Sequence, residues 1–378
     1  MTSAANPIPS AIDTPPLAPP TLSCLFGANN GPLQGQEGNK LTSNLIRERL
    51  IGETDNNVTI TVTKSETDSE KTVVYGRGEL QIGILVEQMR REGFELVLSP
   101  PRILTKKCPD TGKEVEPFEE VVVDVDAEYS GTVVNALTGA RKGVLVEMSD
   151  DNDGKTRLVF EVPSRGLLGF GPEIATLTRG TAVMHHCFLE DREYAGNIGV
   201  GSQKGKLVSN DQGKATLYAL EALSARSTHL FVAPGDMVYP GMVIGENNKA
   251  GDLEVNPVRA KAVTNMRTQS KEEKLYLPPP KRMSVEELIG YMADDEGKHC
   301  VGIILFLFFE CREIKISACI LTSCINLIFR FHTVDEVIEV TPESVRLRKE
   351  ELDSGRRERA ARSKKKQMKA LQENKGKK

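Results

Sequence analysis

The sequence predicts an α+β protein in which two tandem β-α-β-β-α-β domains precede a β-rich C-terminal domain and a basic, disordered tail. Three observations lead to this fold class. Strand-like and helix-like periodicities alternate in one order over residues 21–104, and the same order returns over residues 105–190. From residue 191 onward the apolar runs become short and are interrupted by glycine and proline.

The first domain has the clearest pattern. Four apolar residues follow the i, i+3, i+4, i+7 spacing of a buried helical face, and Gly93 after them is typical of a helix C-terminus; they are Ile82, Leu85, Val86 and Met89. The expected elements are strand Thr21–Gly27, helix Leu41–Leu50, strands Val58–Val62 and Thr72–Tyr75, helix Glu79–Glu92 and strand Phe94–Leu98. This order is that of a ferredoxin-like domain.

The second domain repeats the order. Its expected elements are strand Val121–Val125, helix Tyr129–Leu137, strands Gly143–Met148 and Arg157–Val162, helix Phe170–Leu177 and strand Thr181–Phe188. In both domains an Arg-Gly step, at Arg77 and at Arg165, leads from the third strand into the second helix. The two steps are 88 residues apart, about one domain length, which indicates a duplicated fold.

Residues 191–355 predict the β-rich domain. Short apolar runs indicate it, namely Thr216–Leu220, His229–Val232 and Met237–Ile244. A helix is expected over Val285–Met292 and a last strand over Val337–Arg348. Residues 1–20 are proline-rich and are expected to form an extended linker.

Charge is unevenly distributed along the chain. The 49 Lys and Arg and 53 Asp and Glu give a formal net charge of −4, but residues 356–378 carry +9 and residues 1–355 carry −13. A basic tail of this kind is typical of a non-specific contact with a polyanion, whose affinity falls as salt rises.

Composition argues against several classes of protein. Trp is absent and aromatic residues make up 5%, which argues against an aromatic-lined pocket or a base-stacking platform. No stretch reaches the ~20 apolar residues of a membrane span, and residues 1–20 lack the apolar core of a secretory signal. We therefore expect no membrane contact. Seven cysteines without an export signal favour a reducing compartment.

No catalytic constellation is recognisable. His185 and His186 are neighbours on an expected strand and must point to opposite faces. The stretch Gly201–Leu207 superficially resembles a phosphate loop, but its spacing is wrong and Leu207 stands where a Mg²⁺-binding hydroxyl is needed. A guanine-reading Asn-Lys-x-Asp motif is absent as well. We therefore expect no cofactor in this chain and no GTP hydrolysis by it.

The cysteine-rich stretch contains residue types that can bind zinc, since Cys300, Cys311, Cys319 and Cys324 accompany His299 and His332. Structural zinc ligands come in closely spaced pairs. Only Cys319 and Cys324 approach that spacing, inside an apolar run, so no metal site is expected.

The polar stretch Glu246–Lys274 is the best candidate for binding. It is a long loop with little periodicity, and such loops are usually functional or disordered. Basic and amide side chains on an exposed loop suit contacts with phosphate and 2′-hydroxyl groups. The residues concerned are Lys249, Asn256, Arg259, Lys261, Asn265 and Arg267.

Several motifs resemble the BipA/TypA group of translational GTPases. Residues 75–80 (YGRGEL) and 90–95 (RREGFE) resemble domain III of that group, and residues 163–170 (PSRGLLGF) resemble the domain equivalent to domain V of elongation factor G. Residues 208–210 (VSN), 213–215 (GKA) and 264–267 (TNMR) resemble the C-terminal domain peculiar to the group. The resemblance covers about residues 16–296 and 337–350, with the motifs in the family's order.

The resemblance implies the domain boundaries and the partners. Residues 21–104 correspond to domain III, 105–190 to domain V and 191–355 to the C-terminal domain, which in the family projects a loop towards the acceptor end of the A-site tRNA. That loop corresponds to Gly251–Ser270 here. The implied RNA contacts are Asn256, Arg259, Lys261, Asn265 and Arg267.

The chain departs from the family in lacking, before Pro7, the GTPase domain and the β-barrel domain that follows it. The resemblance thus implies a monomeric chain that binds the ribosome, rRNA and A-site tRNA, while GTP and Mg²⁺ belong to the intact family. It also implies a role in translation and the stress response. A stand-alone RNA-binding or ribosome-assembly protein without a GTPase partner is the alternative.

A second departure is an insertion. The family runs from Asp-Asp-Glu directly into Val-Glu-Val-Thr-Pro, but here residues 297–336 separate Asp294-Asp295-Glu296 from Val337. The segment holds four of the seven cysteines and the wholly apolar run Ile303–Phe309. Our hypothesis is a retained intron, since Gly297-Lys298 and Glu336-Val337 permit donor and acceptor codons in frame. A lineage-specific loop is the alternative.

Two expectations follow from the intron hypothesis. Genomic DNA should carry GT and AG at the two junctions, and a eukaryotic source would place the factor in a chloroplast or mitochondrion, otherwise in the cytoplasm. If the segment is translated, its apolar run should promote aggregation, so a variant without residues 297–336 should be more soluble. Equal yields of the two forms in the soluble fraction would argue against this.

Overall fold

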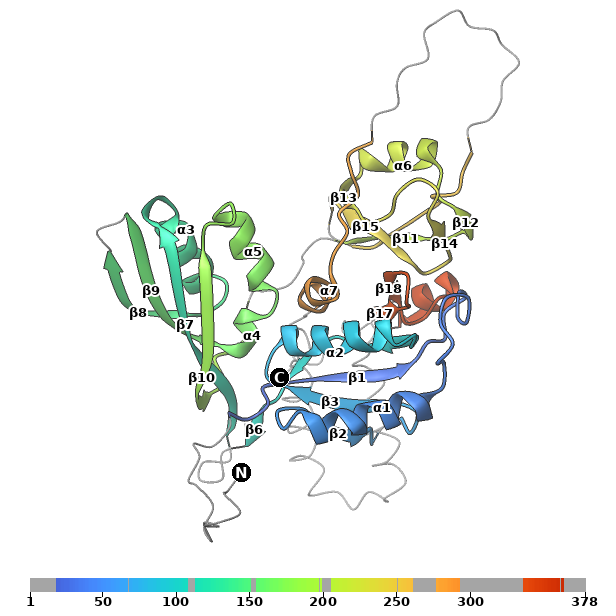
Figure 1. Cartoon of the computed structure of the whole chain (residues 1–378). Helices are drawn as coiled ribbons and strands as arrows, with labels where there is room; N and C mark the ends of the chain where they lie inside the picture. The colour runs from blue at the N-terminus through green and yellow to red at the C-terminus, as the bar shows by residue number, and fades with distance from the viewer. Residues whose placement is uncertain are drawn as a thin grey trace, which may run out of the picture.

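The computed structural model describes residues 18–66, 68–107, 113–150, 154–196, 198, 205–249, 251–260, 277–292, 336–360 and 362–363. The expected α+β class is confirmed at the level of a mixed α/β protein with several sheets (Figure 1). The described part of the chain forms sheets of seven, five, four and two strands.

The first unit, residues 18–103, contains two helices on an antiparallel sheet. Its elements are β1 (Leu22–Ala28), α1 (Ser43–Asn56), β2 (Thr61–Lys64), β3 (Thr72–Gly76), α2 (Glu79–Arg91), β4 (Leu96–Leu98) and β5 (Arg102–Ile103). The strand order is β4-β1-β3-β2, and β5 also pairs with β1. Apolar side chains of α1 and α2 pack on the sheet in one core, including Ile46 and Leu50.

Helix α2 follows the sequence prediction closely. All four residues of its predicted apolar face are buried. The helix ends at Arg91, Gly93 adopts φ +86°, and the Phe94 N–H donates to the Met89 carbonyl at 3.2 Å. This is the glycine-dependent closure of a helix that the pattern predicted.

The predicted strand Val58–Val62 begins later than expected. Val58 is 78% exposed, and β2 starts at Thr61. The side-chain oxygen of Asn57 accepts hydrogen bonds from the backbone N–H and the hydroxyl of Thr59. Such a local turn competes with strand pairing, which is why the alternation of apolar residues was misleading here.

The second unit, residues 106–198, repeats the strand order as β10-β7-β9-β8. Its elements are β6 (Lys106–Lys107), β7 (Glu114–Asp126), α3 (Ala127–Thr138), β8 (Val144–Asp150), β9 (Lys155–Pro163), α4 (Ser164–Leu167), α5 (Phe170–Leu177) and β10 (Val183–Glu193). Helices α3 and α5 have the bounds expected from the sequence to within two residues, and they bury Val133 and Leu137, and Phe170 and Ile174, respectively.

The third unit, residues 205–292, surrounds a four-stranded sheet of order β13-β15-β11-β16. Its elements are β11 (Lys206–Ser209), β12 (Gly213–Lys214), α6 (Leu217–Ser224), β13 (Ser227–Leu230), β14 (Met237–Val238), β15 (Val243–Asn247), β16 (Leu253–Val255) and α7 (Val285–Tyr291). The apolar run Thr216–Leu220 lies in α6, because Thr216 caps a helix there.

The last predicted strand is instead a hairpin. Strands β17 (Glu336–Val340) and β18 (Val345–Lys349) are antiparallel, and β17 pairs with β4 of the first unit, so both extend that sheet. Glu336, the one residue of the predicted insert that is described, begins β17. Deleting residues 297–336 would bring Glu296 to the same place, directly before Val337.

A buried polar network fastens this hairpin to the first and third units. Glu339 of β17 is fully buried and accepts a hydrogen bond from Asn29 at 3.1 Å and another from the Tyr239 hydroxyl. Arg346 and Arg348 each lie 3.8 Å from its carboxylate. One carboxylate therefore lies near two guanidinium groups, of which that of Arg348 is buried and that of Arg346 also pairs with Glu37 at 2.7 Å.

All three units meet at one point. The backbone N–H of Gly169, between α4 and α5, donates to the Glu79 carboxylate of α2 at 3.1 Å. Gly169 has φ +68°, and a Cβ on it would lie 2.9 Å from the carbonyl oxygen of Gly290 in α7. Only glycine permits this approach of the two backbones.

The predicted disordered tail is helical where it is described. Residues 354–360 and 362–363 are in helical conformation directly after β18 (Figure 1, red). The remaining residues of the tail lie outside the described residues.

Candidate nucleic-acid interface

The predicted RNA-binding loop begins beside the N-terminus of α6. Thr216 caps this helix, since its hydroxyl accepts from the Ala219 N–H at 3.2 Å. The same hydroxyl donates to the Arg259 carbonyl at 2.6 Å, and the Thr216 N–H donates to the Pro257 carbonyl at 3.0 Å. One residue thus fixes both the helix end and the start of the loop.

Asn256 shapes the loop from within. Its side-chain oxygen accepts from the Val258 N–H at 2.9 Å, and its side-chain nitrogen donates to Asp211 at 3.1 Å. Gly213 lies against this turn with φ +153°, and a Cβ on it would come within 2.8 Å of Val258. The amide of Asn256 therefore positions the turn, a role that the sequence did not suggest.

Arg259 is presented to solvent at the end of this fixed segment. Its side chain is exposed, and within the described residues its guanidinium has no hydrogen-bond or ion-pair partner. Lys214, exposed on β12 next to Thr216, adds a second positive charge that sequence reasoning did not select. Lys261, Asn265 and Arg267 lie outside the described residues.

The stretch that resembles a phosphate loop has another role where it is described. Lys206 and Leu207 belong to β11, and the Lys206 ammonium lies 3.5 Å from the centre of the Tyr291 ring. Burial lowers the pKa of Lys206, which is only 7% exposed. These residues therefore do not fit GTP and Mg²⁺, because the lysine that would meet the phosphates packs inside the protein.

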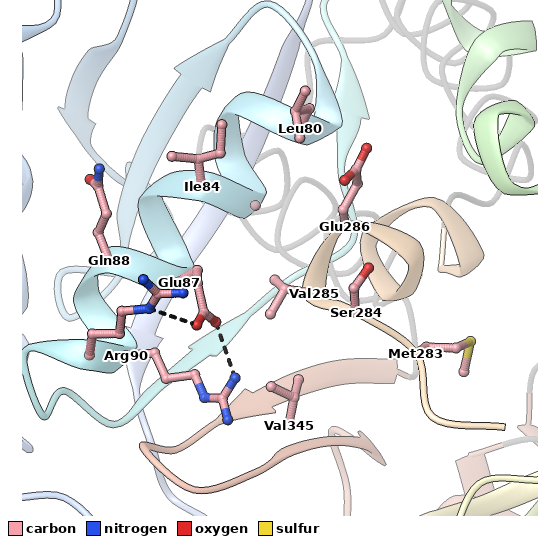
Figure 2. A pocket seen from close by; sticks show the side chains of 12 residues that line it. Leu80, Ile84, Glu87, Gln88, Arg90, Met283, Ser284, Val285, Glu286 and Val345 are labelled. Atoms are coloured by element: carbon pink, nitrogen blue, oxygen red, sulfur yellow. Dashed lines mark hydrogen bonds and ion pairs between the residues drawn. The ribbon is translucent and has the colours of Figure 1, made fainter. Parts of the chain in front are cut away.

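A groove of about 520 Å³ lined by both apolar and polar side chains lies between α2, α7 and β18 (Figure 2). Leu80 and Ile84 of α2 are more than half exposed along it, opposite Met283 and Val285. Ser284 in its wall accepts the Glu287 N–H as a helix cap. The groove offers a surface for contact.

The two neighbouring histidines have different surroundings. His186 pairs with Glu119 at 2.6 Å, and this hydrogen bond raises the pKa of the imidazole. His185 is its neighbour on β10 and lies opposite Val122 of β7. No group of three or more metal-binding side chains occurs among the described residues, which do not include the cysteines from Cys300 onward.

No helix in the described part of the chain is both long enough and apolar enough to span a bilayer.

Two family models match this chain. Residues 113–199 match the elongation factor G C-terminus, and residues 204–301 match the TypA/BipA C-terminal domain. The second match includes Asn256, Arg259 and the loop that they begin.

Curated relatives match over a longer range. The large ribosomal subunit assembly factor BipA of Bacillus subtilis is 38% identical over 92% of this chain and 49% of its own length. The proteins of the same name from Salmonella typhimurium and Synechocystis are 37% and 38% identical, over 92% and 76% of this chain and 50% and 47% of their own lengths. The chain thus spans about half the length of the curated relatives it matches.

Proposed function

Because this chain belongs to the TypA/BipA family, we propose that it acts as a ribosome-associated factor and binds rRNA and A-site tRNA through the loop that begins at Asn256. Its relatives are named as assembly factors of the large ribosomal subunit, so assembly is the stage we assign to it. The chain would act there as a monomer with two ferredoxin-like domains.

The observation that carries this proposal is the presentation of Arg259. Two hydrogen bonds from Thr216 and one from Asn256 to Asp211 hold the start of the loop, while the guanidinium stays exposed and unpaired within the described residues. A cation whose backbone is held at a helix N-terminus is suited to phosphate oxygens. The stand-alone RNA-binding alternative is less favoured, because the relationship to BipA extends over nearly the whole chain.

Replacing Arg259, Lys261 and Arg267 together with alanine should weaken binding to ribosomes. Log affinity falls as log salt rises, and each phosphate contact adds about 0.7 to 0.9 to the steepness of that fall. The loss of three contacts should therefore make the salt dependence shallower by about 2 to 3. Cosedimentation with large ribosomal subunits over a series of KCl concentrations measures both quantities.

The matched control removes three exposed basic side chains elsewhere, with Lys64→Ala, Arg91→Ala and Lys155→Ala. It should bind as the unchanged protein does. Loop-variant binding equal to that of the control at moderate salt would refute the proposal for the loop.

We also propose that the protein is located in the chloroplast or mitochondrion and that it serves translation under stress. Imaging of a tagged full-length gene product tests the proposed location.

A further inference from the structure

The helix after β18, residues 354–360 and 362–363, is firmly attached to the third unit. Arg357 is its anchor: one guanidinium nitrogen lies 2.8 Å from the carboxylate of Glu254, and another donates to the carbonyls of Glu351 and Leu352 at 2.8 Å each. Leu352 packs against the core of the third unit and contacts Gly241. The helix therefore has a fixed position.

The anchor places this helix beside the predicted RNA loop. Glu254 lies in β16, two residues before Asn256, and both side chains are exposed. Glu254 is the middle residue of β16 and Asn256 follows the end of that strand, so the ion pair with Arg357 forms two residues before the start of the loop. A second ion pair, from Lys349 to Asp252 at 2.6 Å, attaches β18 to the same segment.

Three further arginines lie on one side of the helix. Arg356, Arg359 and Arg362 are spaced three residues apart, which brings them within about a third of the helix circumference. The side chains of Arg356 and Arg362 are 70% and 78% exposed. The Arg356 guanidinium lies 3.7 Å from the carboxylates of Glu351 and Asp353, which is a long distance for an ion pair. Exposed ion pairs are weak, so phosphate can replace these carboxylates as the partner of the arginine.

The composition of the helix identifies the chemistry of a partner. Residues 354–363 carry four arginines and one glutamate, and their largest apolar side chain is alanine. A protein interface or a membrane surface would need larger apolar anchors. Residues 1–355 carry a net charge of −13, so an anionic partner is repelled by most of the chain and attracted to the positive charge of this helix.

We propose that Arg356, Arg359 and Arg362 form a phosphate-binding face for RNA on the side of the helix that points away from Glu254, with Arg357 as its positioning residue. The inference rests on the proposed function, since it assumes that RNA is bound at the loop. It adds a second contact, anchored to the first by the Arg357–Glu254 ion pair.

The test uses the full chain and an A-form RNA hairpin, titrated over a series of KCl concentrations. Replacing Arg356, Arg359 and Arg362 with glutamine keeps good helix formers and should lower affinity about tenfold at low salt, with the salt slope reduced by about 2. A control with Lys64→Gln, Arg91→Gln and Lys155→Gln removes the same charge and should bind unchanged. Arg357→Ala keeps the three arginines but frees the helix, and should give an intermediate loss.

The outcomes separate the two proposals. If the arginine variant binds RNA like the control while the loop variant is weakened, the inference is overturned and the proposed function stands. If the unchanged protein does not bind RNA or large subunits, the proposed function fails, and the inference with it. A greater loss on anionic phospholipid vesicles than on RNA would overturn the inference in favour of a membrane surface.

Discussion

Replacing Glu339 with alanine should lower the free energy of unfolding by about 3–5 kcal/mol, the cost typical of removing one partner from a buried ion pair. The substitution removes the carboxylate 3.8 Å from both Arg346 and Arg348, leaving Arg346 with Glu37 alone. It also takes one hydrogen-bond acceptor from Asn29 and the acceptor of the Tyr239 hydroxyl. Arg348 is 1% exposed, so water cannot take the place of the lost charge.

Urea unfolding followed by circular dichroism measures this loss. The control is Glu350→Ala, at the end of the same hairpin, whose side chain is 42% exposed and pairs with Lys71 at 3.3 Å. It should cost less than about 1 kcal/mol, as exposed ion pairs do. A loss for Glu339→Ala as small as that for the control would show that the network does not hold the hairpin.

The second large effect is a dependence of stability on pH through Glu79. Burial at the junction of the three units raises the pKa of this carboxyl to about 7. The hydrogen bond from the Gly169 N–H acts in the opposite direction, because it favours the charged carboxylate. Glu286 of α7 adds to the rise, while His186 of β10 and Arg141 oppose it. In the unfolded chain the pKa is 4.5.

The direction of the effect follows from this difference. Below pH 4.5 both states hold the proton, and between pH 4.5 and 7 the folded state keeps it while the unfolded state loses it. Stability therefore falls as pH rises through this range, by about 3 kcal/mol for a shift of this size. The difference between the unchanged protein and Glu79→Gln isolates the contribution of Glu79 from those of other groups.

Glu79→Gln cannot ionise, so the free energy of unfolding of this variant should exceed that of the unchanged protein at pH 8 and approach it at pH 4.5. Urea titrations at both values decide the matter. A difference between the two proteins that does not change with pH would refute the role of Glu79.

Local patterns were sufficient where a helix buries one regular face. The apolar spacing in α2 and the glycine after it predicted both the buried residues and the end of the helix, because each depends on neighbours a few residues away. The capped helix α7 was found in the same way. The run Thr216–Leu220 was too short for its apolar residues to distinguish strand from helix, and the cap at Thr216 decided it.

Long-range pairing was not predictable from such patterns. Nothing in the alternation of β17 specifies that its partner is β4, since any strand edge with apolar residues would fit. The candidate site also divides into what local sequence predicts and what it does not. Residue type alone identified Arg259 as a candidate. The role of Asn256 could not be predicted, because its side-chain amide bonds to Asp211, 45 residues earlier in the chain.

The pairing of β17 with β4 also has a consequence for how the chain is made. About 240 residues separate Leu98 from Glu336, so at ~5–20 residues per second the edge of β4 waits roughly 12 to 50 s for its partner to be synthesised. During that time a strand edge that pairs readily with other chains is uncovered. The sheet of the first unit is then completed only after the second and third units have been synthesised, and chaperone dependence of the nascent chain should persist until the hairpin of β17 and β18 emerges.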